Sequence, residues 1–389
     1  MRLYLHISKR YFITVLGTAC AVALGLVFGS DQTVHGQRHA TVRLIATAAG
    51  SPIERAGLSA DGSGWALTTA GLEVTRNGGT SFQTVAAPFG LNTITDVATA
   101  GSSITVAARV PQSSGSAAIE IAQSDNTGGS WRTSVLPAGS GAPGYARLAT
   151  DGTSVAGVLV TDESSSAFSD GDWYSTPDGG TTWNHDATPS GGTVTVAGGD
   201  LWLVGGPLRS NVYVSTTDGV SWSPVSLPAA DVGASTVIVG SLADGRVVAA
   251  TSQTNAAGTG ITTNVIASPD GGASWTPLAT LTSDGSVGGG VGPEATLTNG
   301  TVLVAPPGAS SVYVISAQGS TVSTTQSSIS APGTAIGALS SGGGSVLATV
   351  VSSGCPNGKA SCADSSSLLS STDSGVTWSP ITLSASESD

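Results

Sequence analysis

The sequence has few charged side chains and few aromatic ones. Asp, Glu, Lys and Arg make up 10% of the 389 residues, and Phe, Trp and Tyr make up 5%. A disordered chain usually carries more charge and fewer β-branched residues, so this composition predicts a folded, β-rich protein. The formal net charge is −12, which leaves no basic surface for non-specific nucleic-acid binding. We therefore expect no nucleic-acid partner.

Histidine and cysteine are too sparse for a metal centre. His185 is the only histidine beyond residue 39, which excludes a site built from several histidines. Outside the apolar N-terminal run there are two cysteines, Cys355 and Cys362, and no further ligands lie near them in the sequence. We expect these two to form a local disulfide in an oxidising compartment. No metal and no cofactor are expected.

The first 37 residues differ in kind from the rest of the chain. A basic segment precedes the uncharged run YFITVLGTACAVALGLVFG (11–29). This order is typical of a secretory signal peptide, and the run is also just long enough to span a bilayer. Cleavage after Gly29 or Gly36 and retention as an uncleaved anchor both stay open. Either alternative places residues 38–389 outside the cytoplasm, secreted or anchored to the membrane through residues 11–29.

A box with the pattern Ser/Thr-x-Asp/Asn-x-Gly-x-Ser/Thr-Trp/Phe recurs along the chain. Five copies share this spacing, and in a sixth the Asp stands one residue closer to the Trp. In chain order, the Asp or Asn and the aromatic residue of the copies are Asn77 and Phe82, Asn126 and Trp131, Asp178 and Trp183, Asp218 and Trp222, Asp270 and Trp275, and Asp373 and Trp378. A segment at 312–323 aligns with the fourth copy but lacks both residues.

Each part of the box has a structural use. An Asp or Asn in a turn accepts hydrogen bonds from nearby backbone N–H groups, and the Gly supplies a position with φ > 0. The first Ser or Thr hydrogen-bonds locally and closes the loop. The aromatic residue begins the next strand and buries a large apolar surface. We therefore expect the box to be a self-sufficient turn that needs no ligand.

A tight-turn dipeptide between two apolar, β-like runs precedes each box. Seven such turns occur, at Asp61-Gly62, Ala100-Gly101, Asp151-Gly152, Gly198-Gly199, Asp244-Gly245, Asn299-Gly300 and Gly342-Gly343. Dipeptides of this kind between apolar runs are strong hairpin signals. Each unit of roughly 50 residues thus contains four expected antiparallel strands, and seven units predict an all-β, seven-bladed β-propeller over residues 38–389. The run 39–48 offers a further strand to close the ring.

The box resembles the Asp-box, or bacterial neuraminidase repeat, of sialidases, sortilin-type receptors, some glucan hydrolases and photosystem II assembly factors. In these families the box lies on the outer hairpin of a blade, away from the central site. The resemblance therefore implies a fold and not an activity.

The rest of the sialidase pattern is missing. Sialidases hold the substrate carboxylate with three arginines, the first in a Phe/Tyr-Arg-Ile-Pro motif, and use a Tyr nucleophile with a Glu and an Asp. Here Arg55 in SPIERAG is the nearest match to that motif, and its residue order is wrong. The other arginines are scattered and the late tyrosines lie in apolar VYV runs; these residues are Arg109, Arg147, Arg209, Arg246, Tyr213 and Tyr313. We do not expect an active sialidase, and we assign no catalytic residue.

The segment TDESSSAFSDGDWY (161–174) gathers four carboxylates, those of Asp162, Glu163, Asp170 and Asp172. Carboxylates on a loop are ligands for Ca²⁺, but the EF-hand spacing is absent, so we expect a solvated loop without metal. Three tryptophans, Trp65, Trp173 and Trp202, lie outside the boxes. Trp173 is the best candidate for a surface contact with a ligand, together with Asp170 and Asp172, because an exposed Trp stacks on sugars.

These observations favour an exported, non-enzymatic binding or scaffold module that takes a protein or glycan partner through its top face or loops. The alternative is a sialidase-like glycoside hydrolase with a non-standard site. Arginine and acidic side chains that converge at the central channel would favour the hydrolase. A channel mouth lined by Ser, Thr, Gly and apolar residues would favour the binding module.

Overall fold

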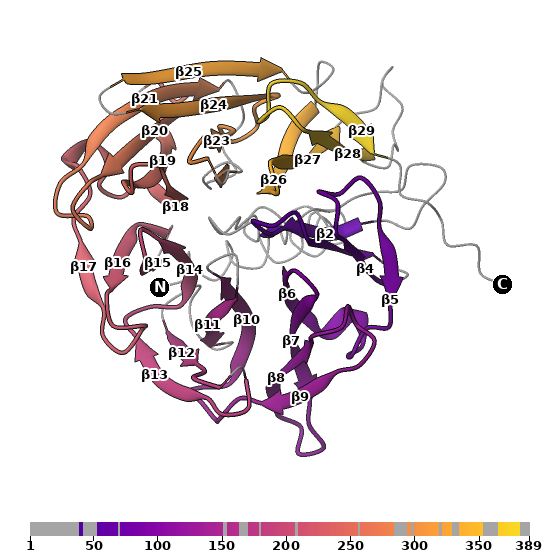
Figure 1. Ribbon diagram of the computed structural model, residues 1–389. Helices are drawn as coiled ribbons and strands as arrows, with labels where there is room; N and C mark the ends of the chain where they lie inside the picture. The colour runs from indigo at the N-terminus through magenta and orange to yellow at the C-terminus, as the bar shows by residue number, and fades with distance from the viewer. Residues whose placement is uncertain are drawn as a thin grey trace, which may run out of the picture.

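The computed structural model describes residues 39–41, 53–68, 71–150, 154–162, 170–178, 180–206, 209–255, 257–283, 294–296, 299–318, 321–328, 334–352 and 365–381. In these ranges the chain is all-β, with short 3-10 turns at Leu91–Thr93 and Ala229–Asp231 (η3). The strands form seven separate antiparallel sheets around a central axis (Figure 1). The predicted seven-bladed propeller with four-stranded antiparallel blades is thereby confirmed.

The first three blades follow the chain order. Blade 1 contains β1 (His39–Thr41), β2 (Ile53–Leu58), β3 (Gly64–Thr68), β4 (Leu72–Thr75) and β5 (Gln83–Val85). Blade 2 contains β6 (Ile94–Ala100), β7 (Ser103–Pro111), β8 (Ala117–Ser124) and β9 (Arg132–Val135). Blade 3 contains β10 (Pro143–Thr150), β11 (Val155–Asp162), β12 (Gly171–Ser175) and β13 (Asn184–Thr188).

The other four blades repeat this arrangement. Blade 4 contains β14 (Gly192–Ala197), β15 (Asp200–Gly205), β16 (Asn211–Ser215) and β17 (Ser223–Val225). Blade 5 contains β18 (Ser235–Ser241), β19 (Val247–Thr254), β20 (Ile261–Ser268) and β21 (Thr276–Ser283). Blade 6 contains β22 (Glu294–Thr296), β23 (Val302–Val304), β24 (Ser311–Gln318) and β25 (Thr321–Ser328). Blade 7 contains β26 (Thr334–Gly342), β27 (Ser345–Ser352), β28 (Ser365–Ser371) and β29 (Ser379–Ile381).

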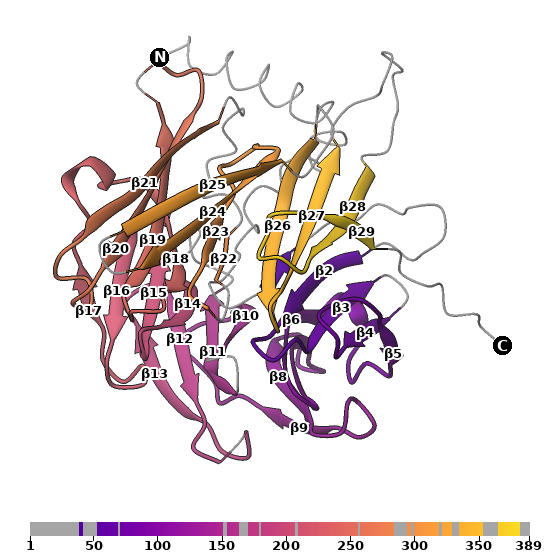
Figure 2. The same ribbon diagram turned by 45° about the horizontal axis from the view of Figure 1, so that its top comes forward.

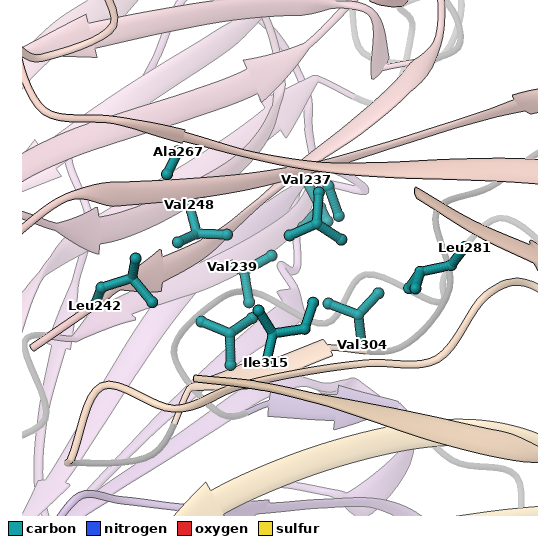
Figure 3. Packing of buried hydrophobic residues seen from close by; sticks show 11 residues of the cluster. Val237, Val239, Leu242, Val248, Ala267, Leu281, Val304 and Ile315 are labelled. Carbon is teal, nitrogen blue, oxygen red and sulfur yellow. The ribbon is translucent and has the colours of Figure 1, made fainter. Parts of the chain in front are cut away.

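The hydrophobic core is divided among the seven interfaces between adjacent blades. Neighbouring blades cover both faces of each sheet (Figure 2), so inner strands are buried on both sides; β3, for example, is buried along its whole length. This explains why inner strands such as β3 and β15 are nearly continuous apolar runs and not alternating ones. Figure 3 shows one of these clusters, which has 11 buried residues between blades 5 and 6; in this view Val239 of β18 lies between Val248 of β19 and Ile315 of β24.

The ring closes without an exchange of strands between blades 1 and 7, because every blade consists of strands that follow one another in the chain. The strand expected within 39–48 is β1, which pairs with β2 and lies beside β26. Leu58 N–H donates to Ser340 Oγ (2.8 Å), and Gly343 N–H donates to the carbonyl of Ala60 (2.8 Å). The cluster at this interface is small and rich in alanine; its buried members are Ala56, Leu58, Ala66, Ala338, Leu347 and Leu368.

The boxes join the third and the outer strand in six blades, and each box packs against the preceding blade. The box glycines have φ between 82° and 92°. A Cβ atom on any of them would come closer than 3.0 Å to a side chain of the preceding blade. In chain order, Gly79, Gly128, Gly180, Gly219, Gly272 and Gly375 face Leu347, Val85, Gln123, Trp173, Val225 and Leu303. Since Leu347 belongs to blade 7, the same contact also closes the ring.

Blade 6 has no box. Gln318 and Thr321 are direct cross-strand partners, so β24 and β25 form a tight hairpin in the segment that aligned with the fourth box. At the interface with blade 5, where this box contact is missing, 11 buried residues form the hydrophobic cluster.

Two predictions concern residues outside the described ranges. They are the signal or anchor segment 1–37 and the disulfide between Cys355 and Cys362. The described residues include no helix that is both long and apolar enough to cross a membrane.

The box glycine contact predicts a large penalty for a single methyl group. Gly272→Ala places a side chain at φ 92° and brings its Cβ to 2.7 Å from Val225 Cγ1. We expect a loss of about 2–4 kcal/mol in the free energy of unfolding, from backbone strain and overpacking together. Denaturant unfolding of the full chain measures this loss.

Gly271→Ala is the matched control, because Gly271 also has a positive φ (68°) but has no atom near its Cβ position. This variant should lose only about 1–2 kcal/mol, the cost of the left-handed backbone alone. Equal losses in the two variants would show that backbone conformation alone, and not the contact with blade 4, requires the glycine.

Candidate functional site

The boxes use their polar groups internally. In the last box, Asp373 Oδ1 accepts the N–H groups of Val376 (3.1 Å) and Thr377 (2.8 Å). Ser371 Oγ donates to Asp373 Oδ1 (2.7 Å) and accepts the N–H of Gly375 (2.8 Å). Asp178 and Asp270 accept the corresponding N–H groups of Thr182 and Ser274, and Asn77 and Asn126 those of Ser81 and Ser130. The carboxylates are thus turned towards their own turns, and the neutral amides make the same bond.

Hydrogen bonding stabilises the charged form of the box carboxylates. The hydroxyl and then the N–H of Thr377 lower the pKa of Asp373 from 3.8 to about 2. The pKa of Asp178 and that of Asp270 are lowered for the same reason, chiefly by Thr182 and Ser274.

The fourth box has a register that differs from the one inferred from the sequence. Thr217 Oγ1, and not a carboxylate, accepts the N–H of Ser221 (3.0 Å), while Ser215 Oγ accepts the N–H of Gly219 (2.9 Å). The spacing therefore equals that of the other boxes. Asp218 stands just before the glycine, with φ 52°, and the assignment of its side chain to the acceptor position is wrong. A threonine hydroxyl has a lone pair for the same N–H, so the turn forms without the acid.

The aromatic residues of the boxes also contact the preceding blade. The indole N–H of Trp131, Trp183 and Trp378 donates to Ala86 O (3.0 Å), Ser134 Oγ (3.1 Å) and Ser327 Oγ (3.2 Å). Trp222 and Trp275 instead meet the rings of Trp173 and Trp202 edge to face, at centroid distances of 6.4 and 6.2 Å. Phe82 packs on the cluster between blades 7 and 1.

The suggested surface site at Trp173 is wrong. Trp173 is fully buried and Asp172 is 4% exposed, whereas Asp170 lies at the surface. Trp65 and Trp202 are also buried, so none of these three indoles can stack on a sugar at the surface. The local pattern could not show this, because burial of Trp173 depends on Trp222 and its neighbours in blade 4. The described residues include no group of three or more potential metal ligands, and Glu163 lies outside them.

Asp172 holds the linker 136–142 between blades 2 and 3. Its Oδ2 accepts both the N–H (2.9 Å) and the hydroxyl (3.1 Å) of Ser140, and its Oδ1 lies 2.8 Å from His185 Nε2. Tyr174 stacks on His185 and donates its hydroxyl to the carbonyl of Pro137 (3.1 Å). Burial and the charge of Asp172 raise the pKa of Tyr174 well above its usual value. The carboxylate stands between Ser and His, so this is not a nucleophile–base pair, in which His would contact the hydroxyl.

Two arginines meet at the innermost strands. Arg55 of β2 donates to the carbonyls of Ile94 (2.7 Å) and Thr95, and Arg147 of β10 donates to the same Thr95 carbonyl (2.9 Å). Asp96 accepts the N–H groups of Val97 and Leu148, each at 2.9 Å. These residues lie on strands of three consecutive blades, so the packing of adjacent blades, and not their spacing in the sequence, brings them together.

A groove of about 660 Å³ lies between blades 2 and 3 and is hereafter called the blade 2–3 groove. It lies on the face where the outer strand β9 continues through the linker into β10. Its walls are mostly apolar or small, and it carries isolated polar groups; typical lining residues are Arg109, Ile119, Val135, Pro137, Asp162 and Tyr174. Arg109 Nε donates to Pro143 O (2.8 Å), which joins the two walls. Sequence reasoning missed this groove, because its residues come from strands of two blades.

Comparison with known proteins gives only structural matches. No family model and no curated protein match the chain. The chain is similar to the solved structure "YCF48 bound to D1 peptide" (17% identity, 81% of this chain and 92% of that one, TM-score 0.48). It is also similar to YCF48 from Cyanidioschyzon merolae (15%, 80% and 95%, 0.49) and to virginiamycin B lyase from Staphylococcus aureus (10%, 80% and 95%, 0.49).

The lowered pKa values predict a loss of stability in acid. A carboxylate whose pKa is lowered by folding contributes stability above its unfolded pKa, and this contribution is lost as the pH falls through the folded value. For Asp373 the loss falls between about 3.8 and 2. The triple variant Asp178→Asn/Asp270→Asn/Asp373→Asn should be less stable than the wild type at neutral pH, because it lacks this contribution, and should lose less stability in that range.

Thermal unfolding midpoints across this pH range compare the two proteins. The boxes of blades 1 and 2 already carry Asn, so the amide is compatible with the turn. A triple variant whose midpoint falls with pH as steeply as the wild type would contradict the assignment.

Proposed function

We propose that the chain is an exported Asp-box propeller that acts as a binding module, and that the blade 2–3 groove takes an extended segment of a partner protein. The observation that carries this proposal is a largely apolar groove without a catalytic pair. Within the described part of the chain, the one Ser–Asp–His contact has the wrong order for nucleophilic catalysis.

The groove is preformed on one side. The linker that forms this side is fixed at Ser140 by Asp172 and at Pro137 by Tyr174. Gly139 and Gly141 lie so close to Asp172 and Asp162 that a Cβ at either position would clash. A rigid wall lowers the entropic cost of binding, because little chain has to be ordered when the ligand arrives.

A protein segment fits these walls better than a glycan does. Val135 is 58% exposed at the groove, and the lining also includes Pro111, Pro137 and Pro143. Sugar recognition favours an exposed aromatic platform. Here Tyr174, the aromatic residue of the lining, is 2% exposed and already stacks on His185.

The export part of the proposal rests on the sequence. A basic start and an apolar run at 11–29 support a signal peptide or anchor over residues 1–37, with the propeller over 38–389. A disulfide between Cys355 and Cys362 suits the same compartment. Three boxes that match the full Asp-box pattern support that family assignment.

The groove assignment predicts a specific loss of binding. Peptides that bind the full chain can be selected from a displayed random library. These peptides should bind the Val135→Asp variant at least about tenfold more weakly than the wild type, because a carboxylate would then lie at the apolar wall of the groove. Val220→Asp is the matched control, since Val220 is 65% exposed in the box of blade 4. Fluorescence anisotropy measures both affinities. Peptides that bind both variants equally, or ligands found only on a glycan array, would contradict the assignment.

A second candidate function follows from Arg55 and Arg147. Guanidinium groups that converge at the inner strands are the feature that a carboxylate-bearing sugar requires. A sialidase-like hydrolase would cleave a fluorogenic sialoside, and Arg147→Lys would reduce that turnover. No turnover by the full chain is the result that the binding module predicts.

A further inference from the structure

The outer strands of a propeller are sheet edges, with unpaired backbone N–H and C=O groups. Folded proteins protect such edges with proline, with charge or by keeping them short. Here β17, β21 and β29 contain Pro224, Pro277 and Pro380. β9 contains Arg132, β13 contains His185 and Asp186, and β5 has three residues.

β25 has none of these protections. It is eight residues long, with the sequence TVSTTQSS, and contains neither proline nor a charged residue. It pairs with β24 through eight consecutive partners without a bulge. In the ring, β25 is the outermost strand of blade 6 (Figure 1), and no described strand pairs with its other edge.

The missing box determines where this edge begins. In the other blades a box occupies the connection between the third and the outer strand, whereas in blade 6 the hairpin turns at once and β25 begins at Thr321. The far end is covered, because Ser327 is buried and bonds to Val376 and Trp378 of the next box. Ser323–Gln326 remain exposed.

The chemistry of this edge fits a second copy of the same chain. Each copy carries a net charge of −12, so two copies repel each other except where their facing surfaces are neutral. The uncharged β25 is such a surface. Antiparallel pairing of β25 with its own copy places Ser, Thr and Gln opposite one another, and Thr–Thr and Thr–Ser pairs stabilise cross-strand contacts.

We propose that β25 pairs edge to edge with β25 of a second copy about a two-fold axis, so that the two blade 6 sheets become continuous. The shared segment centres on Ser323–Gln326, and the backbone groups of the edge supply the hydrogen bonds. A single strand pair buries less surface than a permanent dimer requires, so the association is reversible and depends on concentration.

Sedimentation velocity of the full chain tests this dimer. If the chain has to be extracted from membranes, all samples contain the same detergent. The wild type should dimerise at tens of micromolar. Thr324→Lys places two ammonium groups next to the axis and should raise the dissociation constant at least about tenfold. Thr282→Lys, at an exposed threonine of β21, is the matched control and should leave dimerisation unchanged.

Charge reversal separates pairing from misfolding. Thr324→Glu alone should also be monomeric, whereas an equimolar mixture with Thr324→Lys should dimerise again, because opposite charges then meet at the axis. Thermal midpoints equal to that of the wild type show that both variants are folded. A monomeric wild type, dimers of Thr324→Lys as tight as those of the wild type, or a mixture that stays monomeric would each overturn the proposal. So would a different protein bound at β25 in place of the second copy.

Discussion

The contact between each box glycine and the preceding blade is the constraint on which the ring depends. A four-stranded blade cannot bury both of its faces alone, so it is stable only between two neighbours. The glycines at φ 82–92° bring each outer turn close enough to touch the blade before it. Gly79 makes this contact with Leu347 of the last blade, and so the same geometry that joins neighbours also closes the circle. Blade 6 lacks this contact and packs on blade 5 through a cluster of 11 buried residues that both blades share.

The boxes use their own polar and aromatic side chains within the fold. The box carboxylates and amides accept hydrogen bonds from their own turns, and the box aromatics are used in packing. On the opposite face, linkers cross between the blades. There Asp172 fixes a linker through Ser140 and leaves the blade 2–3 groove beside it. The repeated blades therefore form the scaffold, whereas the blade 2–3 groove and β25 are features that single blades do not share with the others.

The fold could be predicted from the sequence because its signals are local and repeated. A turn dipeptide, two apolar runs and a box need no information from distant residues, and the degenerate segment at 312–323 does mark a blade without a box. The candidate site could not be predicted in the same way. Burial of Trp173 requires Trp222 from the next blade, and the meeting of Arg55 with Arg147 requires three blades. The wrong assignment of Asp218 has another cause. The hydroxyl of Thr217 is an equivalent hydrogen-bond acceptor, so the acceptor position of this box does not require an acidic residue.

Hydrogen–deuterium exchange in Trp275→Ala is the measurement that tests the role of the boxes most directly. Trp275 belongs to blade 5, but its ring meets Trp202 in β15 of blade 4, and the adjacent Gly272 touches Val225 in β17. If the box holds the preceding blade, exchange should accelerate in β15 and β17, while blade 6 keeps the rates of the wild type. Faster exchange confined to β20 and β21, or spread equally to blade 6, would contradict the account.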